Sequence, residues 1–451
     1  MKEKNTAPGL WEKISYGMGD FAQNGLYTLI STYLMFYYTD TVGLSLEMIG
    51  IILLIGRVVD AVCSPIMGVI VDKTSTKYGK CRPYIALGII PVCILLMIMF
   101  SIPQGMSEQG KVTLAIGTYA LYSVMFAMIN VPYATLINVV TDEHQHRVDF
   151  NMFKNIGSNL GAIMVTSVTL TFVAALSGKG NGFSKTAMIF GVLFLITNMM
   201  CAVFTKERLQ GQKGKAVKLG ESLKVLGQNR PWMLLCGVQF LTLMMLTSRN
   251  QGIIYYAKYC LGNETISSWM MTITSVIAVL MSVLLPILIR RHGMKFCVVA
   301  GNVLWCIAMC GSWFAGKNVI WILVFHILAS IGWGIATGGI FVQLTQTIDY
   351  AQWKTGKRPQ GLFTSLLSAV QKLGGAVAGM LCSQILNLGG YVANAVATEQ
   401  VMLAIRVLFC GLPCALGLGV IGIMCFYRLD KMYPQIEKEL SGSLGEEGRK
   451  I

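Results

Sequence analysis

Long apolar runs alternate with short polar segments along almost the whole chain. A membrane-spanning helix needs about 20 mostly apolar residues, and twelve runs reach that length. Transmembrane barrels instead alternate apolar and polar residues with a period of two. The sequence therefore predicts an all-α membrane protein. The predicted spans are 15–38, 47–71, 84–103, 112–140, 150–176, 185–205, 232–257, 266–289, 295–315, 319–349, 362–388 and 401–427.

The composition agrees with this interpretation. Hydrophobic residues fill 54% of the 451 positions and charged residues 13%, whereas soluble proteins average about 25% charged residues. These values exclude a soluble multidomain enzyme, and the abundance of apolar residues excludes a disordered chain. Most of the 13 cysteines lie inside apolar runs, without a metal-binding spacing, so we expect packing residues rather than disulfides or a metal site.

The distribution of basic residues predicts the orientation of the chain. If the N-terminus lies inside, the inner segments hold 26 Lys and Arg residues and the outer loops hold five. Short loops rich in Lys and Arg stay on the cytoplasmic side. We therefore expect both termini in the cytoplasm, an even number of spans and a location in the cytoplasmic (inner) membrane. The net charge of +15 then reflects topology, and no nucleic-acid partner is expected.

A polar stretch at 206–231 divides the chain into two sets of six predicted spans, 1–205 and 232–427, followed by a polar tail at 428–451. Each set has a short basic, glycine-containing loop between its second and third span. Corresponding loops in two halves indicate an internal repeat, as in many transporters. We expect twelve transmembrane helices in two pseudo-symmetric six-helix bundles, with 206–231 and the tail in the cytoplasm.

Several charges fall inside predicted spans, where each costs at least about 2.5–3.5 kcal/mol. Such residues are expected to face water and to pair with one another. Their neighbours support this, because polar and small residues recur at helical spacing beside them and form stripes on one helix face. For Arg249 and Arg406, a structural ion pair explains the charge equally well, and His326 is interpreted as a packing residue. The charged residues are Asp20, Arg57, Asp60, Lys154, Arg249, Asp349, Lys372 and Arg406.

Six short motifs, in order along nearly the whole chain, resemble those of the glycoside–pentoside–hexuronide:cation symporters. This family belongs to the major facilitator superfamily and includes the melibiose and glucuronide permeases. Each motif alone is weak, and together they are specific to the family but not to a substrate. The motifs are Tyr16-Gly17-Met18-Gly19-Asp20-Phe21-Ala22-Gln23-Asn24, Arg57-Val58-Val59-Asp60-Ala61, Gly79-Lys80-Cys81-Arg82-Pro83, Asn130-Val131-Pro132-Tyr133, the stretch from Asp349 to Arg358, and Gln371-Lys372-Leu373-Gly374-Gly375.

The resemblance implies cation-coupled symport of a sugar by alternating access, with no cofactor beyond a coupling ion, H⁺ or Na⁺. It places the cation site on the second span, where Asp60 holds the first carboxylate position and Ser64 replaces a second carboxylate. Because sodium prefers several oxygen ligands, this thin ligand set favours a proton. Lys372 matches the family lysine near the cation site, and protonation of Asp60 is expected to weaken its attraction to Lys372 or Arg57.

The resemblance also implies a central sugar site lined by the helices that carry the polar stripes. Melibiose permeases have acidic residues where this chain has Asn24 and Asn130, whereas Lys154 remains. A cationic side chain suits a substrate carboxylate, which favours a hexuronide such as a glucuronide over a neutral galactoside. Gating by charge pairs is expected from Lys80, Arg82 and Asp349. The expected substrate-binding residues are Asp20, Asn24, Tyr27, Asn130, Lys154 and Lys372.

Other classes remain open at this stage. A carrier of lipid or lysolipid belongs to the same superfamily, and transport of another glycoside or pentoside is equally compatible with the motifs. A transport-deficient sensor is compatible with the changes at Ser64, Gln346 and Gln352. An enzyme is not expected, because HExxH, GxSxG and paired intramembrane aspartates are absent from the sequence. The expected partners are a small sugar and the lipid bilayer, with the monomer as the functional unit.

Overall fold

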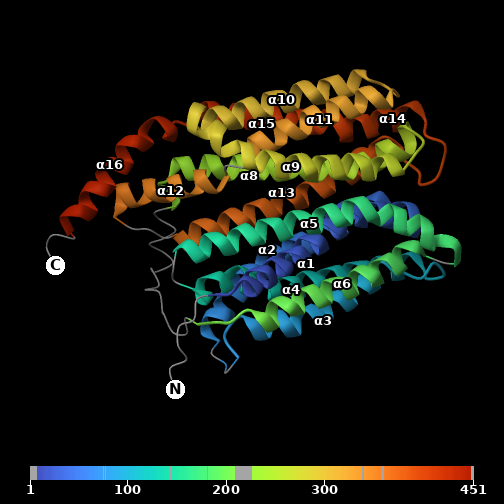
Figure 1. The fold of residues 1–451 in the computed structure, drawn as a ribbon. Helices are drawn as coiled ribbons and strands as arrows, with labels where there is room; N and C mark the ends of the chain where they lie inside the picture. The colour runs from blue at the N-terminus through green and yellow to red at the C-terminus, as the bar shows by residue number, and fades with distance from the viewer. Residues whose placement is uncertain are drawn as a thin grey trace. The chain divides into compact units, whose positions relative to one another are not determined.

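The computed structural model describes residues 8–74, 76, 78–141, 144–179, 181–208, 226–337, 340–356 and 360–447 (Figure 1). Its regular elements in this part of the chain are all helices, which confirms the predicted fold class. The long helices are α1 (Leu10–Phe36), α2 (Leu46–Lys73), α3 (Arg82–Met99), α4 (Glu108–Val140), α5 (His144–Leu176), α6 (Gly182–Phe204), α8 (Arg230–Tyr255), α9 (Thr265–His292), α10 (Met294–Phe314), α11 (Val319–Thr337), α12 (Ile340–Thr355), α13 (Gln360–Leu388), α15 (Leu412–Phe426) and α16 (Leu429–Glu447).

Five short helical elements complete the fold. Three are π-helical segments, which continue a long helix with a wider turn and often mark functional positions. They are η1 (Tyr37–Val42) after α1, η3 (Tyr256–Cys260) after α8 and η4 (Val407–Gly411) between α14 (Glu399–Arg406) and α15; η2 (Ser177–Lys179) is a 3-10 turn.

Nine stretches in the described part of the chain are long and apolar enough to cross a bilayer. Three further long helices, α1, α2 and α9, are not among them, and two of these, α1 and α2, contain the charged and polar stripes seen in the sequence. The predicted span 319–349 extends further, to Thr355, through α11 and α12. The tail, predicted as polar, contains helix α16. The boundaries of the two predicted six-helix halves stay a prediction.

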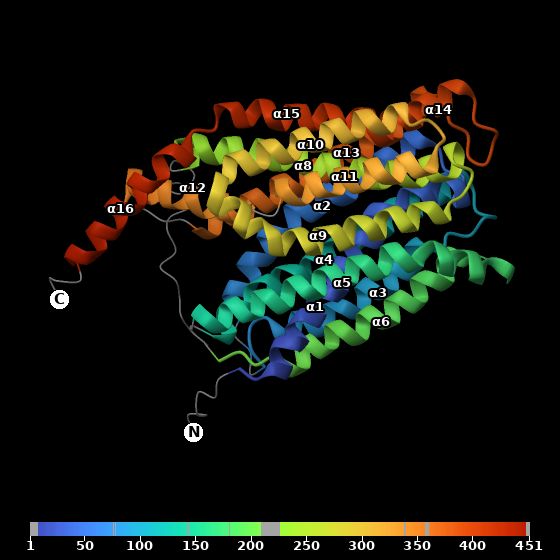
Figure 2. The same ribbon diagram turned by 45° about the horizontal axis from the view of Figure 1, so that its top comes forward.

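The contacts divide the chain into two compact units, which are described separately. The first contains 1–212, 250–275 and 379–405. In it α1 packs against α5 and α6, α4 packs against α2 and α3, and α3 also contacts α6 (Figure 2). An aromatic core holds this packing, in which the rings of Tyr16 and Tyr133 stack 4.7 Å apart.

Helices α1 and α5 approach each other backbone to backbone. A Cβ atom added at Gly157 would collide with the carbonyl oxygen of Gly17, and one at Gly161 with that of Phe21. Only glycine permits helices to approach this closely. The short separation brings the polar faces of α1 and α5 together.

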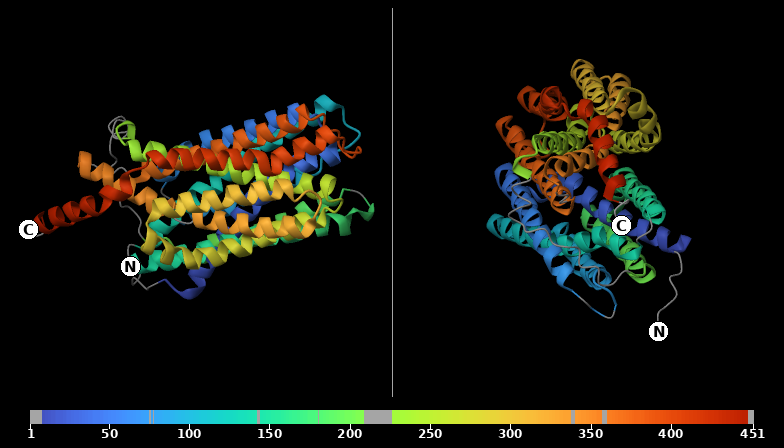
Figure 3. Two further views of the ribbon diagram at one scale, coloured as in Figure 1. Left: turned by 90° about the horizontal axis from the view of Figure 1, so that it is seen from above. Right: turned by 90° about the vertical axis from the view of Figure 1, so that its left-hand side faces the viewer.

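The second unit contains 213–249, 276–378 and 406–451. Helix α10 packs against α11 and α15, and α12 contacts α16; the end-on view in Figure 3 shows these helices along their axes. Trp305 belongs to one core cluster together with Met245 and Met309. Tyr433 of α16 donates a hydrogen bond of 2.9 Å to Asp349 Oδ2, which joins the tail helix to α12.

Candidate functional site

A small pocket surrounds Asp60 inside the first unit. Its free volume of about 20 Å³ holds one water-sized group. The wall comes from three helices, α1, α2 and α4. The lining residues are Tyr27, Ile30, Arg57, Asp60, Tyr119, Tyr122, Ser123 and Phe126.

Asp60 and Arg57 are both buried in this pocket, with 5% and 9% of their surface exposed. Ser64 lies one helical turn after Asp60, and its hydroxyl is 2.8 Å from the Asp60 carbonyl oxygen and 3.3 Å from Oδ1. The Arg57 guanidinium carbon lies 4.6 Å from the centre of the Tyr27 ring, in cation–π geometry. The structure thus brings Tyr27 of the first predicted span beside three residues that the sequence placed on one face of the second, Arg57, Asp60 and Ser64.

The aromatic wall of the pocket was missed by the sequence analysis. Tyr119, Tyr122 and Phe126 recur at i, i+3 and i+7 and face α2 from α4. A Cβ atom at Gly56 would collide with the Tyr119 ring, so α2 presents a glycine where this ring packs. The helical spacing of these rings could have placed them on one face, but core packing explains the same pattern.

A second polar group lies on the face that α1 shares with α5. Asn24 Nδ2 donates a 2.8 Å hydrogen bond to the carbonyl oxygen of Ser158. The Ser158 side chain donates a hydrogen bond to Asp20, and Lys154 is close enough to interact electrostatically with the Asp20 carboxylate. The predicted substrate residues Asp20, Asn24 and Lys154 therefore lie within one cluster, and the glycine contacts of α1 and α5 set their spacing.

Asn130, which lies two residues before the proline of α4, contacts α1. Its Nδ2 lies 3.0 Å from Gln23 Oε1. Gln23 is buried, and its Nε2 finds no hydrogen-bond partner in the described residues. Leaving a buried amide donor without an acceptor costs about 1–3 kcal/mol. The oxygen of a water molecule or of a ligand hydroxyl group would serve as an acceptor for Gln23 Nε2. The sequence analysis did not select Gln23.

Lys372 and Asp349 belong to the second unit. Lys372 lies on α13, directly after Gln371, whose Nε2 is 2.9 Å from Gln239 Oε1 of α8. Asp60 lies in the other unit, so the meeting of Asp60 with Lys372 stays a prediction. Asp349 accepts the hydrogen bond from Tyr433 already described.

Lys80 and Arg82 lie where the loop after α2 leads into α3, and the side chain of Glu207 binds the backbone of this segment. The Glu207 carboxylate accepts hydrogen bonds from the amides of Lys80, Cys81 and Arg82 at 2.8–2.9 Å. Arg82 in turn donates to the carbonyl oxygens of Ala202 and Val203, at the end of α6. The acidic group thus covers the start of α3 and the basic group covers the end of α6, which suits both helix dipoles. Glu207 was not predicted.

Arg249 is almost fully buried in the second unit. Its Nη2 lies 2.8 Å from His326 Nδ1, and its guanidinium carbon lies 4.4 Å from the centre of the Trp305 ring. Among the described residues no carboxylate forms an ion pair with it. Because a guanidinium only donates hydrogen bonds, His326 Nδ1 is the acceptor. Arg249 is held by a neutral histidine and an aromatic face.

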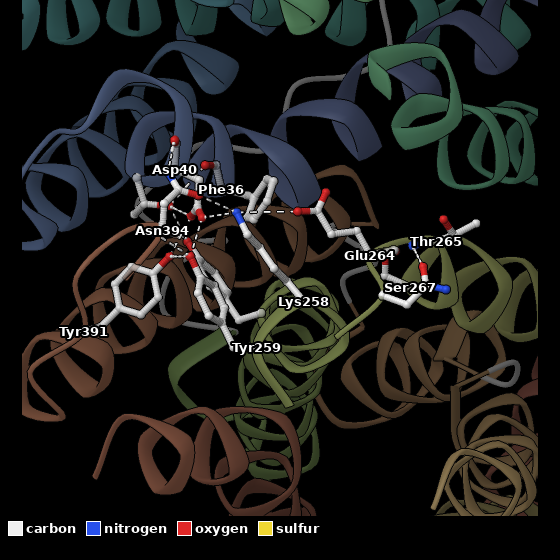
Figure 4. Close-up of polar contacts among 12 residues, drawn as sticks. Phe36, Asp40, Lys258, Tyr259, Glu264, Thr265, Ser267, Tyr391 and Asn394 are labelled. Carbon is white, nitrogen blue, oxygen red and sulfur yellow. Dashed lines mark hydrogen bonds and ion pairs between the residues drawn. The ribbon is translucent and has the colours of Figure 1, made fainter. Parts of the chain in front are cut away.

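Asp40 is the centre of a buried network that the sequence analysis missed (Figure 4). Its Oδ1 accepts hydrogen bonds of 2.6 Å from Lys258 Nζ and from the Tyr259 hydroxyl, and its Oδ2 accepts one of 2.7 Å from the Tyr391 hydroxyl. Burial raises the pKa of the Tyr391 hydroxyl, which keeps this group a donor. Asn394 donates to the backbone carbonyl oxygen of Asp40.

In the part of the chain that the structure describes, bilayer-length apolar helices enclose buried polar clusters, an arrangement typical of multi-pass membrane transport proteins. Residues 15–431 match the model of a family described as MFS/sugar transport protein, and the chain belongs to this family. The chain is 32% identical over 453 residues to the isoprimeverose transporter of Lactiplantibacillus pentosus, covering 98% of this chain and 94% of that protein. It is 28% identical over 443 residues to the glucuronide carrier protein homolog of Escherichia coli (strain K12), covering 95% and 94%.

Solved structures agree on the fold. A D-xylose-proton symporter superposes with a TM-score of 0.70 at 13% identity, covering 93% of this chain and 98% of that chain. The nucleoside transporter NupG superposes with a TM-score of 0.64 at 15% identity, covering 92% of this chain and 100% of that chain. The major facilitator fold and a transport role rather than an enzymatic one, both expected from the sequence, are therefore confirmed.

Proposed function

We propose that the protein imports a glycoside of the hexuronide type by symport with a proton that binds at Asp60. Membership of the sugar transport family and a relative named as a glucuronide carrier homolog support the general activity. The observation that carries the proposal is the buried pocket in which Asp60 lies beside Arg57 and Ser64.

The size and lining of this pocket favour a proton over sodium. Sodium, like other hard cations, prefers several oxygen ligands, whereas Asp60 is the one carboxylate in the pocket lining, which it shares with the guanidinium of Arg57 and otherwise only neutral hydroxyl and apolar groups. A second cation is repelled by that guanidinium, but a proton on Asp60 removes a negative charge and needs no further ligand. The free volume, suited to one water-sized group, also excludes a sugar from this pocket.

The sugar is assigned to the polar cluster of α1 and α5. Asp20 and Asn24 offer an acceptor and a donor for hydroxyl groups, and Lys154 offers a cation for a carboxylate. Charge-assisted hydrogen bonds are about twice as strong as neutral ones. A uronide would therefore gain more from Lys154 than an uncharged glycoside.

Coupling follows from charge compensation. When Asp60 takes up a proton, Arg57 loses an anionic neighbour within the pocket, and the helices around it can adopt a second arrangement. Moving one charge inward releases about 2.3 kcal/mol per 100 mV of membrane potential, which corresponds to about 50-fold accumulation of sugar. The expected motion is rocking of the two helical halves about the bound substrate.

Uptake into proteoliposomes tests the proposal. Labelled methyl glucuronide, isoprimeverose and methyl glucoside are compared under an imposed proton or sodium gradient. We expect accumulation of the glucuronide driven by the proton gradient, its loss in Asp60→Asn, and retained counterflow of labelled sugar in that variant. Asp149→Asn, which removes a carboxylate that pairs with Lys13 outside the pocket, is the matched control. Unchanged uphill accumulation in Asp60→Asn contradicts the assignment.

A further inference from the structure

Two π-helical segments of the first unit carry the same short sequence pattern. Segment η1 contains Tyr37-Tyr38-Thr39-Asp40, and η3 is entered through Tyr255-Tyr256-Ala257-Lys258. Each continues the first long helix of a predicted half, α1 or α8, and each is followed by a glycine with positive φ, 74° at Gly43 and 71° at Gly262. Internal repeats are common in transporters, and Asp40 and Lys258 each follow their tyrosine pair at the same spacing, so we treat them as corresponding positions.

The two equivalent positions carry opposite charges, and they bind each other. Lys258 Nζ lies 2.6 Å from Asp40 Oδ1, and only 3% of the Asp40 side chain and 19% of the Lys258 side chain are exposed. Identical residues at two equivalent positions would repel each other if both were charged. The change of sign between the repeats turns this meeting point into an attractive contact.

The remaining contacts make Asp40 the acceptor on which two distant segments converge. Besides Lys258 and Tyr259 of η3, its carboxylate accepts hydrogen bonds from Thr39 and from Tyr391, which lies between α13 and α14. Asn394 of the same connection closes the ring, because its side-chain oxygen accepts from Lys258 Nζ at 2.8 Å. Asn394 has a φ of 59°, the one positive value among the described non-glycine residues, which fits a backbone held in place by these contacts.

We infer that Asp40 and Lys258 are a pair of gating residues that hold one end of the transport route closed and must separate each time that end opens. This rests on the alternating access of the proposed function. Because α1 and α8 each begin one predicted half, the halves cannot part at this end while the pair is intact. A contact between charged groups suits a reversible gate, since water replaces each hydrogen bond when the gate opens.

Asp40 and Lys258 contribute unequally to this network, so the inference predicts which of two substitutions opens the gate more. Removing the charge of Asp40, as in Asp40→Asn, leaves its four donors with one neutral acceptor oxygen in place of two charged ones; these donors are Lys258, Tyr259, Tyr391 and Thr39. Removing the charge of Lys258 leaves Asp40 with three hydroxyl donors. Glu264 also pairs with Lys258, at 3.5 Å, but its side chain is 43% exposed, and such exposed pairs contribute little.

The native Cys260 reports the state of the gate. It lies in η3, two residues after Lys258, and is buried with 7% exposure. A membrane-impermeant maleimide added to right-side-out or inside-out vesicles measures its accessibility from each side, and Cys260→Ser in each background subtracts labelling of the other cysteines. No substrate is required, so a failure of this test is distinct from a failure of the transport assay.

We expect faster labelling of Cys260 from one side only, about tenfold in Asp40→Asn and about threefold in Lys258→Gln, since hydrogen bonds to charged groups are stronger than neutral ones and the carboxylate keeps its hydroxyl donors in the second variant. Glu264→Gln, the matched control, is expected to change labelling less than about twofold. If Asp40→Asn does not insert, Tyr391→Phe, which removes one donor, replaces it and is expected to fall near Lys258→Gln. Unchanged labelling in Lys258→Gln, or an equal rise in Glu264→Gln, overturns the inference.

Discussion

Ser64 donates hydrogen bonds to the backbone carbonyl oxygen and to the carboxylate of Asp60, one helical turn earlier on α2. The resemblance to sodium-using melibiose permeases implies a second carboxylate at the position of Ser64. The hydroxyl therefore stands where a sodium ligand is expected, and it is directed at the one carboxylate that remains in the pocket.

Ser64→Asp is expected to introduce sodium dependence. A second carboxylate beside Asp60 completes an oxygen-rich ligand set of the kind that hard cations prefer. We expect sodium to stimulate uptake by more than about threefold in this variant, and not in the parent protein or in Ser64→Asn. Uptake in sodium and in choline buffers at fixed pH measures the effect. Equal stimulation of Ser64→Asn would show that the carboxylate is not the cause.

Lys154→Gln is expected to separate charged from neutral substrates. Loss of one charge-assisted hydrogen bond costs about 1.5–3 kcal/mol, so the affinity for methyl glucuronide should fall at least about tenfold while that for methyl glucoside changes little. Lys185→Gln removes a lysine that bonds the Leu176 carbonyl oxygen and serves as the control. A parallel loss for both sugars would place Lys154 in a structural role.

Gly157→Ala is expected to force α1 and α5 apart. The added methyl group would collide with the carbonyl oxygen of Gly17, and overpacking of this kind costs about 1–3 kcal/mol. The melting temperature in detergent should fall by several degrees, and sugar binding should weaken because Asp20 and Lys154 move apart. Gly117→Ala, in open space on α4, should leave both unchanged.

Glu207→Gln is expected to loosen the start of α3. The carboxylate accepts three backbone amide hydrogen bonds, and a neutral amide group accepts them more weakly. Amide hydrogen exchange at Lys80–Arg82 should accelerate about tenfold or more, because local opening becomes easier. Glu439→Gln, on the exposed face of α16, should leave this exchange unchanged. If these amides exchange as slowly in Glu207→Gln as in the parent protein, the hydrogen bonds of Arg82 to the end of α6 stabilise this segment instead.

The sequence predicted well what depends on residues close together in the chain. The helical period placed Arg57, Asp60 and Ser64 on one face of α2, and bilayer length and apolar composition predicted the helices. The cluster of Asp20, Asn24 and Lys154 followed from two separate polar stripes, although their meeting depends on the glycines of α1 and α5.

The missed residues owe their role to contacts between distant segments. Asp40, Lys258 and Tyr391 lie at or beyond helix ends, where charged and aromatic residues are ordinary. Nothing local marks Glu207, whose three partners are more than 120 residues earlier. Arg249 was recognised as an unusual charge, but the neutral partner His326 could not be foreseen without knowing which helices touch.

The backbone contact between α1 and α5 has a consequence for motion. Two helices in contact through Gly17, Gly157 and Gly161 have no layer of side chains between them, so we expect them to move as one rigid body. The distance between Asp20 and Asn24 on α1 and Lys154 on α5 then stays constant. We therefore expect a conformational change to reorient these side chains together, so that a sugar bound by them changes the side it faces while its contacts stay the same.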